Sequence, residues 1–157
     1  MKARLGKVTD RHCGAAVLRQ DYRLAPHCHS LTLAVRCRLG SLPQEHLALL
    51  DTGAAYSVVS EEVVEAIADH LGDPLGPISI STRFGNKEGG LYRLPTTLLS
   101  DEGHGLDLIV ESTFAVLSDW PGPVVLGFKG FLERLCITID PGIVPSDPAM
   151  LFFGPAA

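Results

Sequence analysis

The chain has 157 residues, which is enough for one domain with its own core and too few for two ordinary domains. Its 18 acidic and 13 basic residues give a net charge of −5 and are scattered along the sequence, so no basic patch offers a footprint for nucleic acid. No apolar run approaches the roughly 18 residues needed to span a bilayer, and the first residues lack the apolar segment of a secretory signal. We therefore expect a cytoplasmic protein with no membrane partner.

The composition also indicates a β-rich chain. Aromatic residues make up 6% and hydrophobic residues 46% of the sequence, so the core must be built from Leu, Val, Ile and Ala. Sixteen glycines and eleven prolines are typical of a chain with many turns. The four cysteines show no paired spacing, and in a reducing compartment we expect free thiols. These cysteines are Cys13, Cys28, Cys37 and Cys136.

Residues 1–29 show no periodicity and are set apart as a lead of uncertain role, either a pro-segment or extra strands, before a domain at 30–154. The segment His27–His29 holds two histidines that would share one face of an extended chain, but no third ligand is evident. We therefore predict no metal and no other cofactor. Alternation of apolar and polar residues predicts strands at 31–39 and 45–50.

A helix is predicted over 60–71. Ser60 is a good N-cap, Gly72 suits the position after the last helical residue, and Pro74 prevents the helix from resuming. A second, short helix is predicted at 129–135. The helical stripe of the first consists of Val63, Val64, Ile67 and Leu71.

The remaining pattern is that of strands. Residues 78–84 and 91–94 flank a glycine-rich segment that we expect to form a mobile hairpin tip, because few apolar contacts would hold it. This tip consists of Gly85, Asn86, Lys87, Glu88, Gly89 and Gly90. Further strands are predicted at 95–99, 106–110, 113–117 and 136–140, and a final apolar run lies at 150–153.

The sharpest chemical feature is the segment Leu49–Ala54, which reads Leu-Leu-Asp-Thr-Gly-Ala. Two apolar residues place the carboxylate of Asp51 at the end of a buried strand, and Gly53 permits a tight turn directly after it. Taken alone, an Asp-Thr-Gly tripeptide is weak support for a catalytic site, since a plain turn at a strand end explains it equally well.

The order of features around this segment resembles the retropepsin-like aspartic proteases of the cellular or bacterial type, over about residues 30–154. Four features carry the resemblance: Leu49–Ala54 followed by Ser57–Ser60, a glycine-bearing hairpin at 80–94, the segment Val124–Gly127, and residues 128–140. In the family these correspond to the catalytic loop, the flap, the apolar segment behind the loop, and a helix with a closing strand.

The resemblance implies an all-β, closed-barrel-like acid-protease fold. It also implies that Asp51 is catalytic, that Thr52, Gly53 and Ala54 support it, and that residues 85–90 act as a flap. Thr52 would hydrogen-bond to its counterpart in a second chain, and Gly53 would lie beside the substrate backbone. The residues behind the catalytic loop would be Val125, Leu126 and Gly127.

Only one Asp-Thr-Gly motif is present, so one chain would supply half of a two-carboxylate site. The resemblance therefore implies a homodimeric aspartic endopeptidase, in which two Asp51 carboxylates share a proton and activate water against a peptide or protein substrate. The alternative function is a non-catalytic dimeric peptide-binding or scaffolding module on the same fold.

Several positions keep alternatives open. Three positions that are charged in the viral members are uncharged here, so the way in which the viral members hold substrate is not carried over. These positions are Ala55, Tyr56 and Phe128. The run Met150–Phe153 lies either at a dimer interface or in an ordinary last strand of the core. Trp120 either lines a specificity pocket or anchors its own turn.

Overall fold

The computed structural model describes residues 11–17, 19–20, 33–67, 71–140 and 149–156. Strands dominate the described residues, which confirms the predicted all-β class. Segments of the predicted lead contribute two short strands, β1 and β2. The segment His27–His29 lies outside the described residues. No helix among the described residues is long and apolar enough to cross a membrane.

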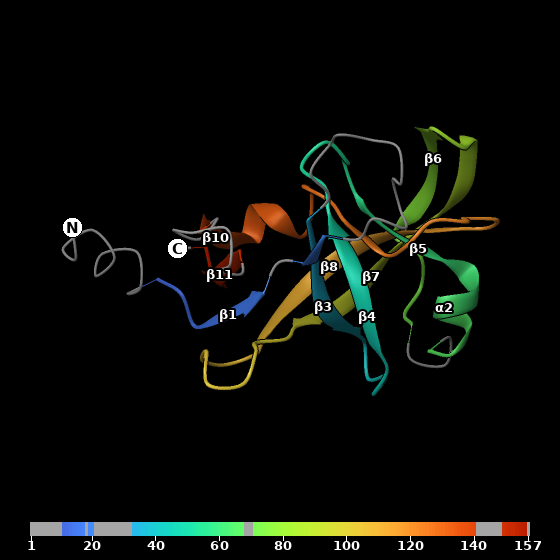
Figure 1. Cartoon of the computed structure of the whole chain (residues 1–157). Coiled ribbons are helices and arrows are strands. Elements are labelled where there is room, and N and C mark those ends of the chain that lie inside the picture. The colour runs from blue at the N-terminus through green and yellow to red at the C-terminus, as the bar shows by residue number, and fades with distance from the viewer. Residues whose placement is uncertain (1–10, 18, 21–32, 68–70, 141–148, 157) are drawn as a thin grey trace.

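Six strands close into a barrel (Figure 1). The hydrogen-bonded order is β3-β4-β9-β5-β8-β7, and β7 pairs back onto β3 and so removes two open edges. Two more strands extend this sheet, β2 beside β3 and β6 beside β7. Their bounds are β2 Arg19–Gln20, β3 Leu33–Leu39, β4 Glu45–Leu50, β5 Ser57–Ser60, β6 Gly76–Thr82, β7 Gly85–Leu98, β8 Leu108–Leu117 and β9 Val125–Leu126.

A separate three-stranded sheet combines both ends of the chain. Its order is β1-β11-β10, with β11 (Met150–Pro155) between β1 (Gly14–Val17) and β10 (Leu135–Asp140). Leu151 and Phe153 of β11 are fully buried. Because both edges of β11 are already paired within the chain, its backbone has no free edge for a strand of a second copy. The structure thus supports the interpretation of residues 150–153 as an ordinary core strand.

The core fills the barrel with aliphatic side chains and a few phenylalanines, as the composition indicates. Burying each large apolar side chain contributes about 1.5–3 kcal/mol relative to exposing it. The largest fully buried apolar residues are Phe114, Phe131, Phe153, Leu39, Ile67, Leu98, Leu117, Leu126, Leu151, Val35 and Val59. The scaffold that carries the candidate site is therefore densely packed.

The helix α2 runs over Glu61–Glu65 and is shorter than the predicted helix at 60–71. Its start is as expected, because the Ser60 hydroxyl accepts a hydrogen bond from the Val63 N–H at 3.4 Å. Beyond Glu65 the chain tightens, and the Ile67 N–H donates to the carbonyl of Val64, three residues back. The apolar stripe is nevertheless buried at Val64 and Ile67.

The prediction of a helix at 129–135 is wrong. The structure has one 3-10 turn there, Leu132–Arg134, followed by β10. Gly130 has a φ of 76°, and Phe131 has a φ of −136°. Neither dihedral is compatible with a right-handed helix, so an α-helix cannot form across this segment.

The prediction that residues 85–90 form a glycine-rich hairpin tip is also wrong. These residues form the first half of β7 and pair with β6, so the turn between the strands is only Arg83 and Phe84. A Cβ on Gly89 would lie 1.9 Å from the Val116 carbonyl oxygen of β8. Glycine is therefore needed at that position for close strand pairing rather than for a loop.

The hairpin strands are also longer than their predicted pieces. The strands predicted at 91–94 and 95–99 form part of continuous β7, and those predicted at 106–110 and 113–117 join in β8. The short strand β5 was not predicted as a strand. Its parallel pairing with β8 and its antiparallel contact with β9 place the chain after the Asp-Thr-Gly turn inside the barrel wall.

Candidate active site

Asp51 directly follows β4 and is positioned by β9. The two strands are parallel, with Leu50 beside Leu126. The Asp51 N–H donates to the Leu126 carbonyl at 3.1 Å, which extends the ladder by one residue past the end of β4. The start of the Asp-Thr-Gly turn is therefore held by a strand more than 70 residues away in the sequence.

The carboxylate of Asp51 shapes its own turn. Its Oδ1 accepts a hydrogen bond from the Gly53 N–H at 2.8 Å, and its carbonyl accepts one from the Ala54 N–H at 3.2 Å. Asp51 is half-buried, whereas Thr52 and Gly53 are exposed. In the described part of the chain, the Oδ2 oxygen has no hydrogen-bond partner, so one carboxylate oxygen is oriented by the backbone and the other is available.

The segment after β9 supports the turn from the other side. Gly127 donates its N–H to the buried Ser57 hydroxyl at 3.1 Å, and a Cβ at Gly127 would lie 2.3 Å from the Tyr56 carbonyl oxygen. The next two N–H groups, of Phe128 and residue 129, donate to the carbonyls of residues 54 and 55 at 2.9 and 2.8 Å. The predicted segment Val125, Leu126 and Gly127 thus lies against the Asp51 turn.

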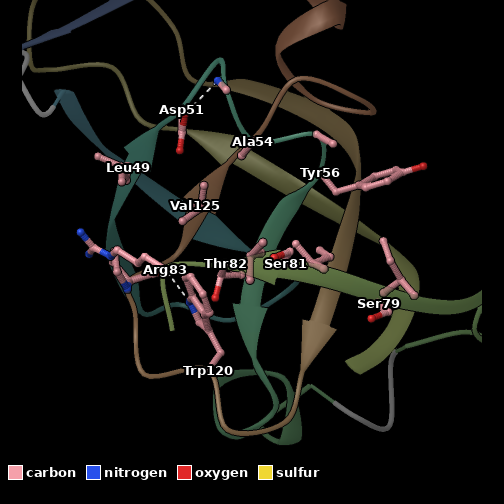
Figure 2. Close-up of a pocket in the computed structure, with 16 residues that line it drawn as sticks. Leu49, Asp51, Ala54, Tyr56, Ser79, Ser81, Thr82, Arg83, Trp120 and Val125 are labelled. Atoms are coloured by element: carbon pink, nitrogen blue, oxygen red, sulfur yellow. Dashed lines mark hydrogen bonds between the residues drawn. The ribbon is translucent and has the colours of Figure 1, made fainter. Parts of the chain in front are cut away.

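A pocket of about 660 Å³ lies beside this turn (Figure 2). Its walls come from β4, β5, β6, β9 and the loop before β9, so segments distant in sequence meet around it. Most of the lining is apolar, and the only charged residues in the described lining are Asp51 and Arg83. The lining consists of Leu49, Asp51, Gly53, Ala54, Ala55, Tyr56, Val58, Ile78, Ser79, Ile80, Ser81, Thr82, Arg83, Trp120, Pro123 and Val125.

Trp120 fits both interpretations made from the sequence. Its indole N–H donates to the Pro123 carbonyl at 2.8 Å, which anchors the turn before β9. The same side chain lines the pocket and meets the Phe84 ring edge-on, with centroids 5.5 Å apart and an interplanar angle of 80°. The tryptophan therefore links the pocket wall to the turn of the β6–β7 hairpin.

The hairpin contributes to the site through residues that the sequence pattern did not single out. Consecutive residues 78–83 line the pocket, whereas none of the residues 85–90 does. The alternation along β6 predicts which side chains are apolar, but it does not reveal that the whole edge of this strand faces a cavity. Only the placement of β6 beyond β7 brings Thr82 and Arg83 to the site.

Other reactive residues lie away from this pocket. Cys13, Cys37 and Cys136 are free thiols, and Cys28 lies outside the described residues. Burial raises the pKa of the Cys37 thiol to about 12, so this group is not a nucleophile at neutral pH. Burial also lowers the pKa of His46, whose Nε2 is buried without a hydrogen-bond partner among the described residues. No group of three metal-binding side chains occurs among the described residues.

Comparison with known proteins gives structural neighbours only. No family model and no curated protein matches the sequence. The fold is similar to EIAV protease complexed with the inhibitor HBY-793, at 19% identity and a TM-score of 0.42, covering 64% of this chain and 86% of that one. It is also similar to the retroviral protease-like domain of Ddi1 from Leishmania major, at 16% identity and a TM-score of 0.46, covering 75% of this chain and 91% of that one.

Proposed function

We propose that this chain is an aspartic endopeptidase that works as a homodimer, with Asp51 of each copy forming the catalytic pair. The observation that carries this proposal is the position of Asp51. Its carboxylate lies on a backbone-held Asp-Thr-Gly turn at the side of a largely apolar pocket of about 660 Å³. A pocket of this size and lining suits side chains of a peptide.

The need for a second copy follows from the chemistry. Peptide hydrolysis by this route uses two carboxylates, and the chain carries one Asp-Thr-Gly motif. A two-fold axis beside the exposed Thr52 and Gly53 would bring a second Asp51 next to the first. Phe128, which is 51% exposed beside the turn, would become buried in the same contact.

The pair of carboxylates would act as acid and base together. Two carboxylates about 3 Å apart do not both ionise, so the pair shares one proton, as is general for aspartic proteases. The ionised group accepts a proton from water, whose oxygen then attacks the carbonyl carbon of the peptide. The protonated group donates to the carbonyl oxygen, and a proton passes to the departing amine as the C–N bond breaks.

The β6–β7 hairpin is proposed to cover the bound peptide. β6 lines the pocket, and among the described strands it is hydrogen-bonded on one side only, to β7. A strand held on one side moves at lower cost than a strand inside the barrel. In this proposal the flap comprises residues 76–91, with β6 as its edge strand, residues 85–90 as the strand behind it and Arg83 with Phe84 as its tip.

The direct test is hydrolysis of a diverse peptide library across pH by the wild type and by Asp51→Asn. We expect the substitution to lower the cleavage rate by at least about 10²–10⁴-fold, the usual contribution of acid–base catalysis, without unfolding the protein. A substituted protein that cleaves as fast as the wild type contradicts the proposal. If the wild type binds peptides and cleaves none, the scaffolding alternative is favoured.

The quaternary state has its own test. We expect sedimentation analysis to give a dimer at micromolar concentration, since a single chain supplies half the site. Cleavage by a protein that is monomeric under assay conditions would contradict the paired mechanism.

A further inference from the structure

The pocket beside Asp51 contains a cation that the proposed chemistry does not use. Arg83 lines the pocket from the hairpin tip, and the remaining described lining apart from Asp51 is uncharged. Ile78, Ile80 and Val125 supply part of an apolar wall around it. The site therefore combines an apolar surface with one positive charge.

Arg83 has no carboxylate partner in the part of the chain that the structure describes. Its described contact is with the neighbouring Phe84, whose ring centroid lies 4.8 Å from the guanidinium carbon. Stacking on an aromatic face leaves the edge of a guanidinium free, and that edge carries the N–H donors that match a carboxylate. The cation is thus available to a ligand.

A series of contacts keeps this cation near the pocket. The Thr82 hydroxyl accepts a hydrogen bond from the Phe84 N–H at 3.0 Å and donates to the Gly85 carbonyl at 2.9 Å, which defines the two-residue turn. The Phe84 ring then packs edge-on against Trp120, which is anchored by its own hydrogen bond to residue 123. Arg83 therefore lies in a turn that is shaped by the hydrogen bonds of Thr82 and linked to the pocket wall by the contact between Phe84 and Trp120.

We infer that Arg83 is a specificity-determining residue that selects peptides carrying an acidic side chain, Asp or Glu, at the position that enters this pocket. The inference rests on the proposed function, because it names the substrate class of the same site. The methylene part of a glutamate side chain would pack on the apolar wall while its carboxylate meets the guanidinium. The net charge of −5 disfavours acidic peptides in general, and a local cation would offset that repulsion at this position.

The test measures binding separately from cleavage. Trp120 is the only tryptophan of the chain and lines the pocket, so its fluorescence reports occupancy. The probes are acetylated and amidated octapeptides, identical except for Glu, Gln or Lys at one scanned position, titrated into Asp51→Asn protein. We expect the best Glu peptide to bind about five-fold more tightly than its Gln counterpart, the upper range for a partly exposed ion pair.

Variants of the cation identify its role. Arg83→Gln should remove the difference between Glu and Gln peptides, and Arg83→Glu should reverse the preference toward Lys. Arg11→Gln makes the same change in net charge at an exposed position outside the pocket, and it should leave the preference intact. Thermal melting checks that each variant folds, which we expect because Arg83 is exposed at a turn.

Each outcome decides a different claim. Equal binding of Glu and Gln peptides to Asp51→Asn protein, or an unchanged preference in Arg83→Gln, overturns the role of Arg83. An equal loss in Arg11→Gln also overturns it, because net charge alone would then explain the effect. If the preference follows Arg83 but the wild type cleaves no peptide, the protease proposal fails and the recognition of acidic side chains stands.

Discussion

The Asp51 turn and the tip of the β6–β7 hairpin line the same pocket, but the chain holds them in different ways (Figure 2). The turn is bonded through the main chain to β9 and to the residues after it, which lie far away in sequence. The hairpin tip is shaped by local bonds of Thr82, and the ring contact between Phe84 and Trp120 links it to the loop before β9.

This difference predicts that the two walls of the pocket, the Asp51 turn and the hairpin tip, differ in rigidity. Several long-range hydrogen bonds fix the position of the turn. A catalytic group needs a fixed position, because small displacements of reacting groups lower the reaction rate. An aromatic pair contributes only about 0.5–1.5 kcal/mol beyond its burial, so the tip can separate and re-form at low cost. Under the proposed function, we therefore expect a rigid wall that carries Asp51 and a movable wall that carries Arg83.

The largest expected effect is at the rigid wall. Gly127→Ala would place a Cβ 2.3 Å from the Tyr56 carbonyl oxygen, so β9 or the turn must shift. We expect the free energy of unfolding to fall by about 3 kcal/mol and peptide cleavage to be lost. Urea denaturation and a cleavage assay measure these two effects.

Gly72→Ala is the matched control for this substitution. No atom of the described residues lies within 4 Å of a Cβ built at Gly72, so the free energy of unfolding should change by no more than about 0.5 kcal/mol. A Gly127→Ala protein as stable as this control would show that the turn is less tightly held than its contacts indicate.

A second prediction concerns the buried residue Cys37 of β3, which pairs with His46 of β4. Burial raises the pKa of the Cys37 thiol from its usual value of 9.0 to about 12. The folded state therefore binds the thiol proton more tightly, and its contribution to stability is lost as the pH rises from 9 toward 12. The slope for one group is at most about 1.4 kcal/mol per pH unit.

Substitution isolates this contribution. Urea denaturation between pH 8 and 11 should show a steeper loss of stability for the wild type than for Cys37→Ala. Val35→Ala, at a buried position of β3 that carries no titratable group, should keep the wild-type slope. Parallel slopes for all three proteins would mean that water reaches Cys37 in the folded barrel.

The smallest expected effect is at the movable wall. Phe84→Ala removes the edge-on contact with Trp120, and we expect the global free energy of unfolding to fall by less than about 1 kcal/mol. Amide hydrogen exchange should nevertheless become faster in β6 and the first half of β7. Leu75→Ala, at another exposed apolar residue before β6, should leave that exchange unchanged. Faster exchange throughout the barrel would remove the distinction between the two walls.

Much of the site follows from short-range sequence pattern. The apolar pair before Asp51 and the glycine after it predict a carboxylate at a strand end, and the structure has β4 ending at Leu50. Ser60 is likewise found as the N-cap of α2. These features depend on neighbours within a few residues, so a single sequence contains the information for them.

The errors have a common physical cause. Glycines at 85–90 resemble a loop, but Gly89 is in a strand because the backbone of β8 comes too close for a side chain. Gly130, in contrast, adopts a φ of 76°, which is incompatible with the helix predicted at 129–135. The same residue type serves close packing in one place and a left-handed turn in the other, and composition alone does not separate the two.

The sequence by itself determined the all-β fold class, the place of Asp51 after β4, and the presence of one Asp-Thr-Gly motif per chain. The tertiary structure alone decided that β7 closes the barrel onto β3, and that Arg83 and Trp120 meet at the pocket of Asp51. A period of two indicates which face of a strand is buried, but it does not name the strand that covers it. Long-range pairing of strands therefore built a pocket beside the short motif, with the Asp51 turn on one side and the Arg83 cation on the other.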